Sequence, residues 1–99
     1  MWQATAGYVY LRGVTTDLSW DDLRTLSVLA AEKADDASLP IHDRERWSDV
    51  AERVFSSEAT ANDLRATAEL ASLDAALQRD AKARQRYLDL AQRAITAAR

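Results

Sequence analysis

From residue 19 to the C-terminus the hydrophobic positions recur with the period of an α-helix, and polar residues fill the positions between them. Capping residues and breaks in the pattern divide this region into segments. The predicted helices cover residues 19–37, 43–57, 60–79 and 81–98. We therefore expect an all-α fold, a small bundle of three or four helices in a single domain over residues 1–99, with a short N-terminal arm over residues 1–16.

The first helix has a clear start signal. Ser19 is a good N-cap, and Asp22 three residues later completes a capping box with an acid in place of glutamate. Leu18 and Leu23 flank this box at the spacing of a hydrophobic staple. The helix must end before Pro40, because the residue that precedes a proline is driven out of the α region.

The second helix is the most clearly amphipathic segment. Asp43 is its predicted N-cap. Trp47, Val50 and Val54 then follow the spacing of one helical face, and charged residues occupy the opposite face. The bulk of these side chains predicts that Trp47 belongs to the core.

The stretch from residue 58 to residue 99 contains no Gly or Pro. Thr60 begins it, with Asp63 as the predicted capping-box partner. Apolar stripes at 64–77 and 87–95 are separated by a polar middle. One helix of about 38 residues would be about 57 Å long, which is far beyond a compact domain of this size, so we favour two helices with a turn near Asp80. A single long helix would require a partner chain.

Residues 7–14 have a different pattern, in which aromatic and β-branched side chains alternate with a period of two. This pattern is typical of a strand, yet we find no second strand candidate in the rest of the chain. A single strand cannot satisfy its own backbone groups. Three alternatives remain open: the segment is helical, it pairs with its copy in a dimer, or it lies extended over the helices.

Composition limits the class of protein. The chain has 47% hydrophobic and 29% charged residues, a net charge of −3 and no cysteine, which is typical of a globular protein and disfavours free duplex DNA as the default partner. No apolar run is long enough to span a bilayer and no signal peptide is evident, so we expect a cytoplasmic protein. Two lysines against eleven arginines indicate a GC-rich genome, as in a bacterium or phage.

The charge is unevenly distributed along the chain. Residues 17–38 carry six acids against two basic residues, a net of −4, and residues 80–99 carry five basic residues against two acids, a net of +3. Two interpretations follow. Either the two segments lie side by side in one chain, or copies of the chain associate acid to base.

The chain offers little chemistry for catalysis. His42 is the single histidine and has no nucleophile or orienting group near it in sequence. The acids lack the ligand spacing of a calcium loop, and the two glycines, Gly7 and Gly13, do not form a phosphate-binding loop. We predict no enzymatic activity, no cofactor and no metal.

We therefore expect a non-enzymatic protein-interaction module, an adaptor, inhibitor or regulator, that also self-associates as a homodimer. Aromatic residues are frequent anchors of protein interfaces. The candidate interface residues are the N-terminal aromatics Trp2, Tyr8 and Tyr10 together with Trp20 at the start of the first helix.

The alternative function is a small DNA-binding transcriptional regulator with a degenerate helix-turn-helix at residues 47–66. Its second helix would present Thr60, Asn62, Asp63 and Thr67, with Arg65 as the cation. The candidate contacts to nucleic acid or to an acidic partner are Arg79, Lys82, Arg84 and Arg86. Nucleic acid remains the less favoured partner.

Overall fold

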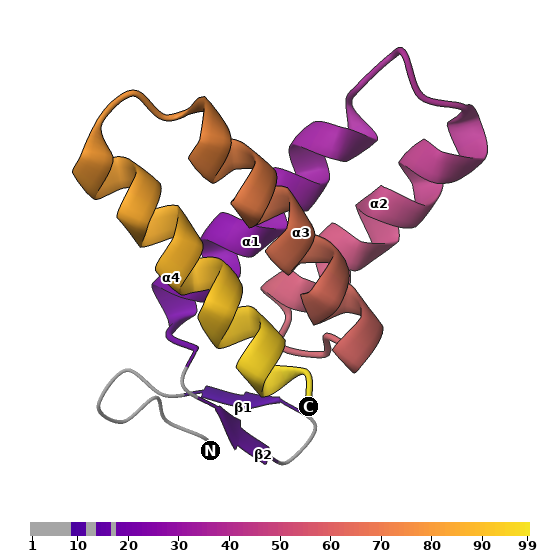
Figure 1. The fold of residues 1–99 in the computed structure, drawn as a ribbon. Coiled ribbons are helices and arrows are strands. Elements are labelled where there is room, and N and C mark those ends of the chain that lie inside the picture. The colour runs from indigo at the N-terminus through magenta and orange to yellow at the C-terminus, as the bar shows by residue number, and fades with distance from the viewer. Residues whose placement is uncertain (1–8, 12–13, 17) are drawn as a thin grey trace.

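The computed structural model describes residues 9–11, 14–16 and 18–99. Its elements are two short strands, β1 (Val9–Leu11) and β2 (Val14–Thr16), followed by four helices, α1 (Trp20–Ala34), α2 (Ile41–Phe55), α3 (Ala61–Leu77) and α4 (Ala81–Ala97) (Figure 1). The expected all-α fold of three or four helices is confirmed with four.

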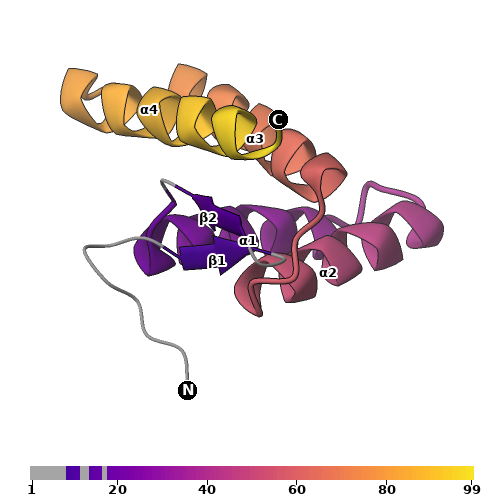
Figure 2. The same cartoon turned by 90° about the horizontal axis from the view of Figure 1, so that it is seen from below.

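The four helices form two helical hairpins. α1 packs mainly against α2, and α3 packs mainly against α4. Figure 2 shows the hairpins as two layers, and α1 contacts α3 where the layers cross. The core lies at this crossing and is rich in leucine and alanine. Its buried members are Leu18, Leu23, Leu26, Leu29, Val54, Ala59, Leu64, Ala68, Leu70, Ala71, Leu90, Ala91, Ala94 and Ala98.

Both predicted capping boxes are confirmed. The Ser19 hydroxyl accepts a hydrogen bond from the Asp22 N–H at 3.0 Å, and the Ser19 N–H donates to the Asp22 carboxylate at 3.0 Å. The Thr60 hydroxyl and the Asp63 carboxylate repeat this exchange at 3.1 and 3.0 Å. Each box satisfies backbone donors that the first turn of a helix leaves unpaired.

The predicted start of the second helix at Asp43 is wrong. α2 begins at Ile41 with Pro40 as its N-cap residue, so Asp43 is the third residue of the helix. The Pro40 carbonyl accepts hydrogen bonds from the N–H groups of Asp43 and Arg44 at 3.0 and 3.1 Å. Proline needs no partner for a backbone N–H and has a fixed φ, so it can stand at the helix start without a side-chain cap.

The stretch after residue 58 forms two helices. α3 ends at Leu77 and α4 begins at Ala81, with the Asp80 carboxylate accepting a hydrogen bond from the Ala83 N–H at 2.9 Å. The longest dimension of the molecule is 40 Å, which is shorter than the roughly 57 Å of a continuous 38-residue helix.

The strand-like N-terminal segment finds its partner within the chain. β1 pairs antiparallel with β2, and Val9 lies opposite Thr16 while Leu11 lies opposite Val14. The inference that the chain holds no second strand candidate was therefore wrong. A run of three β-branched residues, Val14–Thr16, is too short to stand out in a periodicity analysis.

Candidate functional site: two interhelical clefts

The two helical hairpins are built from similar sequences. Residues 44–53 of α2 read RERWSDVAER, and residues 84–93 of α4 read RQRYLDLAQR. Five of these ten positions are identical, and four more keep similar chemistry. The first helices share Asp-Leu-Arg at 22–24 and 63–65. The chain therefore contains an internal repeat, offset by 41 residues in the first helix of each hairpin and by 40 in the second.

Two equivalent ion pairs join the hairpins. Arg93 of α4 donates to the Asp22 carboxylate of α1 at 2.9 and 3.1 Å. Arg53 of α2 donates to the Asp63 carboxylate of α3 at 2.8 and 2.9 Å. In each case the arginine of one hairpin's second helix holds the capping-box aspartate of the other hairpin. Because the two ion pairs are equivalent, the two hairpins are related by an approximate two-fold axis.

The two pairs differ in the burial of the carboxylate, while the two arginines are similarly exposed. The Asp63 side chain is 5% exposed, whereas that of Asp22 is 17% exposed. Burial raises the pKa of Asp63, but the hydrogen bonds from Arg53 and from the Thr60 N–H outweigh it, so the pKa lies below its usual value. The same pairing raises the pKa of Arg53. The carboxylate is therefore held ionised inside the protein.

A second pair of repeated arginines has an equivalent structural role. The Arg44 guanidinium donates to the Ala34 carbonyl at 2.8 Å, and Arg84 donates to the Gln78 carbonyl at 3.0 Å. Each side chain thus satisfies a carbonyl at the end of the preceding helix, where intrahelical partners run out. Both members of this repeated pair therefore have a structural role.

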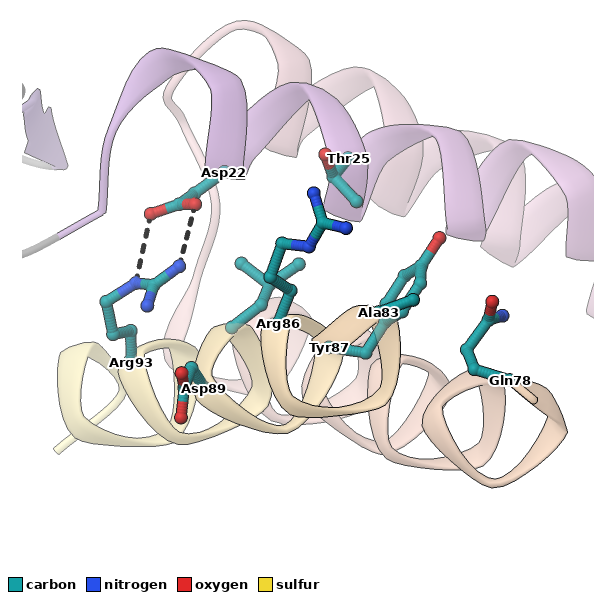
Figure 3. A pocket seen from close by; sticks show the side chains of 9 residues that line it. Asp22, Thr25, Gln78, Ala83, Arg86, Tyr87, Asp89 and Arg93 are labelled. Atoms are coloured by element: carbon teal, nitrogen blue, oxygen red, sulfur yellow. Dashed lines mark hydrogen bonds and ion pairs between the residues drawn. The ribbon is translucent and has the colours of Figure 1, made fainter. Parts of the chain in front are cut away.

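The third repeated pair of arginines is Arg46 and Arg86, and each of them lines a cleft. The first cleft has a volume of about 500 Å³ and lies between α1 and α4 (Figure 3). Its lining residues are Asp22, Thr25, Gln78, Ala83, Arg86, Tyr87, Asp89, Leu90 and Arg93. Figure 3 shows the side chains of Arg86 and Tyr87 directed towards α1, while Asp89 points away. Asp89 instead accepts a hydrogen bond from Gln85 at 2.8 Å.

The second cleft, of about 400 Å³, lies between α2 and α3 and is the counterpart of the first. Each of its lining residues has an equivalent in the first cleft. The equivalent pairs are Asp43 and Ala83, Arg46 and Arg86, Trp47 and Tyr87, Val50 and Leu90, and Ala66 and Thr25. Both clefts therefore combine an arginine, an aromatic ring and an aliphatic wall.

The clefts differ at one charged position. In the second cleft Asp43 forms an ion pair with Arg46 at 2.8 Å, and the Arg46 side chain is 80% exposed. In the first cleft the equivalent position is Ala83. No ion pair within residues 18–99 involves Arg86. The guanidinium of the first cleft is thus the more available one.

Of the four predicted aromatic interface residues, Trp20 lines neither cleft. Trp20 is the first residue of α1 and packs, partly buried, against the hydrophobic core. Tyr10 lies in β1, and Trp2 and Tyr8 fall outside the described residues. Trp47, expected in the core, contacts it while also lining the second cleft.

The four predicted basic contacts have different environments. Arg79 and Lys82 are exposed at and just after the turn between α3 and α4. Arg84 binds the Gln78 carbonyl, and Arg86 lines the first cleft. Contact of these four residues with nucleic acid or an acidic partner stays a prediction.

Two of the residues that the helix-turn-helix alternative would use to contact bases are buried. Asp63 and Thr67 are 4% and 0% exposed. Asp63 is paired with Arg53, and the Thr67 hydroxyl donates to the Asp63 carbonyl at 2.9 Å. A recognition helix reads bases with side chains that it presents to solvent. This face of α3 belongs to the protein interior instead.

The uneven charge along the chain has an intramolecular counterpart. Asp22 belongs to the acidic segment 17–38, and Arg93 belongs to the basic segment 80–99. Their ion pair places these segments side by side within one molecule, which is the first of the two interpretations of the charge pattern. The charges beyond this pair are mostly exposed.

His42 is exposed at the start of α2. Across the described ranges, no three metal-ligating side chains gather into a possible metal site, and none of the helices there is long and apolar enough to cross a membrane.

Comparison with family models, curated proteins and solved structures finds no match for this chain. The clefts therefore have to be interpreted from their own residues.

Proposed function

We propose that this protein is a non-enzymatic protein-interaction module, an adaptor, inhibitor or regulator, that binds partner segments in its two clefts. The observation that carries the proposal is the repeated Arg46 and Arg86. The repeated arginines 44/84 and 53/93 hold helix ends and join the hairpins. Arg46 and Arg86 have no such role, yet both halves retain them beside an aromatic ring in a cleft.

The residue types in the clefts support a protein partner. Arginine, tyrosine and tryptophan are the residues most enriched at the energetic centres of protein interfaces. Their aromatic faces provide contact area, and the guanidinium supplies directional hydrogen bonds.

An exposed apolar stripe on α3 extends the second cleft. Leu73 follows Ala66 by seven residues and Leu77 follows Leu73 by four, so the three lie on one face of the helix. Leu73 is 58% exposed and Leu77 is 76% exposed. A partner that covers this stripe would remove large apolar side chains from water, which favours association.

The predicted homodimer, the cytoplasmic location and the contacts of Trp2, Tyr8 and Tyr10 remain predictions within this proposal. Light scattering at tens of micromolar tests the homodimer directly. A monomeric mass at this concentration would exclude the homodimer and leave binding to other proteins as the proposed function. Deleting residues 1–14 tests the arm, because an interface role predicts a greater loss of binding than of helicity.

Site-specific photo-crosslinking in the native host tests the proposed function. The crosslinker p-benzoylphenylalanine replaces Tyr87 in one variant and Trp47 in a second. The matched control is Val28, which is 51% exposed and lines neither cleft. We expect defined crosslinked products from both cleft positions and none from position 28. Equal products at all three positions, or none at the cleft positions, would contradict the proposal.

A further inference from the structure

The geometry points to a specific ligand class: we infer that each cleft binds a peptide segment of a partner protein in which a carboxylate lies beside an apolar side chain. One chain would then bind two such segments. This inference rests on the proposed function and adds the chemistry and number of the bound segments.

The charge of the clefts favours a carboxylate. A guanidinium binds a carboxylate through two parallel N–H donors. In the first cleft Arg93 is already paired with Asp22, which leaves Arg86 as the lining cation that has no described ionic partner. One available positive charge matches one carboxylate. Since Arg93 balances Asp22, a dianionic phosphate would have only Arg86 to balance its two charges.

The walls of the clefts favour an apolar neighbour. Tyr87 and Leu90 in the first cleft have Trp47 and Val50 as their equivalents in the second. An aromatic ring next to an aliphatic side chain accommodates a leucine- or phenylalanine-like group, and its burial supplies the non-directional part of the affinity. A free small anion uses the arginine alone and gains nothing from these walls.

The two sites differ in expected strength. Asp43 competes for Arg46 in the second cleft, whereas Ala83 leaves Arg86 available in the first. The first cleft should therefore bind the segment more tightly. An exposed pair such as Asp43–Arg46 is worth little, so the difference should be about two- to fivefold.

Amide NMR titration of the full-length chain tests the inference. The probe is the peptide acetyl-Leu-Glu-Leu-amide, and the matched control is acetyl-Leu-Gln-Leu-amide. We expect the glutamate peptide to shift the signals of Tyr87 and Trp47, with a Kd on the order of 1 mM because so small a probe buries little surface. The glutamine peptide should bind about fivefold or more weakly, since its amide cannot form the charge-assisted pair.

Single substitutions separate the two sites. Arg86→Gln should remove the shifts in the first cleft only, and Arg46→Gln those in the second only. A sharper test exchanges the residues at the one charged position where the two clefts differ. Ala83→Asp should weaken the first site, and Asp43→Ala should strengthen the second, each by about two- to fivefold.

Several outcomes of the titration would overturn the inference. Equal binding of the glutamine peptide would exclude the carboxylate, shifts confined to one cleft would exclude the pair of sites, and equal shifts by sodium acetate would reduce the clefts to small-anion sites. The proposed function fails separately, through the absence of crosslinks at Tyr87 and Trp47. Crosslinks at both clefts with no response to the glutamate peptide would keep the interaction and reject this ligand class.

Discussion

Asp22 and Arg93 are 71 residues apart in the chain and are joined by two hydrogen bonds of 2.9 and 3.1 Å. The Asp22 carboxylate also accepts a hydrogen bond from the Ser19 N–H at the start of α1. The equivalent Asp63 carboxylate accepts hydrogen bonds from the Thr60 N–H at the start of α3 and from Arg53. Each helix start is thereby coupled to the opposite hairpin, and the hairpins are fixed relative to each other by charge as well as by the core.

The two ion pairs should contribute unequally to stability. Arg53→Ala leaves the nearly buried Asp63 carboxylate without its main partner, whereas Arg93→Ala leaves a more exposed Asp22. We expect the free energy of unfolding to fall by about 2–3 kcal/mol for Arg53→Ala and by about 1 kcal/mol for Arg93→Ala. Urea unfolding followed by circular dichroism measures both.

A double-mutant cycle with Asp22→Ala and Asp63→Ala isolates the pair energies from the loss of the capping boxes. Asp21→Ala serves as the control, because Asp21 is an exposed first-turn acid outside both ion pairs. Equal effects of the two arginine substitutions would show that burial of the carboxylate does not determine the contribution of each ion pair to stability.

The depressed pKa of Asp63 predicts a pH dependence of stability. Its pKa is lower in the folded protein than in the unfolded chain, where it is close to 3.8. The stabilisation is therefore complete above the unfolded-state value and is lost as the pH falls through the folded-state value. Unfolding free energies measured from pH 7 down to about pH 2.5 should decline in the acid range.

Asp63→Asn provides the comparison for this prediction, because it removes the titrating carboxylate and keeps a similar shape. The variant should be less stable than the natural chain at pH 7, and the difference should shrink below the unfolded-state pKa. A difference that stays constant down to the lowest pH would show that the ionised carboxylate contributes nothing to folding.

Local signals in the sequence were sufficient for three of the four helix starts, whereas the predicted helix ends lie one to three residues beyond the observed ones. The boxes at Ser19 and Thr60 and the cap at Asp80 depend on residues within one turn, so their spacing identifies them directly. The start of α2 differs from the one predicted at Asp43, because the fixed backbone of Pro40 begins the helix without a side-chain cap.

The clefts were missed because their signal lies in the polar positions. The resemblance between 44–53 and 84–93 was present in the sequence, but a search for hydrophobic periodicity passes over arginines. Pairing of Arg93 with Asp22 depends on how the hairpins cross, and no local pattern determines that crossing. The repeat could therefore be predicted from the sequence. Which helix faces meet to form the clefts could be seen only in the structure.

Ser57 offers a stabilising substitution at the end of α2. It has a φ of 64°, in the left-handed region that favours glycine. The Glu58 N–H donates to the Arg53 carbonyl at 2.7 Å, and the Ser57 N–H donates to the Val54 carbonyl at 3.2 Å, which is a Schellman motif. The buried Ser57 hydroxyl has no hydrogen-bond partner in the described structure.

Ser57→Gly should therefore raise the free energy of unfolding by about 0.5–1 kcal/mol, because it relieves the left-handed strain and removes the buried hydroxyl. Thermal unfolding measures the gain. Ser56→Gly is the matched control: Ser56 has a negative φ and its hydroxyl donates to the Glu52 carbonyl at 2.9 Å, so glycine there should destabilise the protein. A loss of stability in Ser57→Gly would contradict the expected strain.

The exposed stripe on α3 provides a test that separates binding from folding. Leu77 is 76% exposed, so Leu77→Gln should change the free energy of unfolding by no more than about 0.5 kcal/mol. If a partner covers the stripe, the same substitution should reduce crosslinking from Trp47 while leaving that from Tyr87 intact, because Leu77 extends the second cleft. Leu70→Ala is the contrasting variant: Leu70 is buried in the core and its truncation should cost about 2–4 kcal/mol. Unchanged crosslinking from Trp47 in Leu77→Gln would exclude the stripe from the interface and confine binding to the clefts themselves.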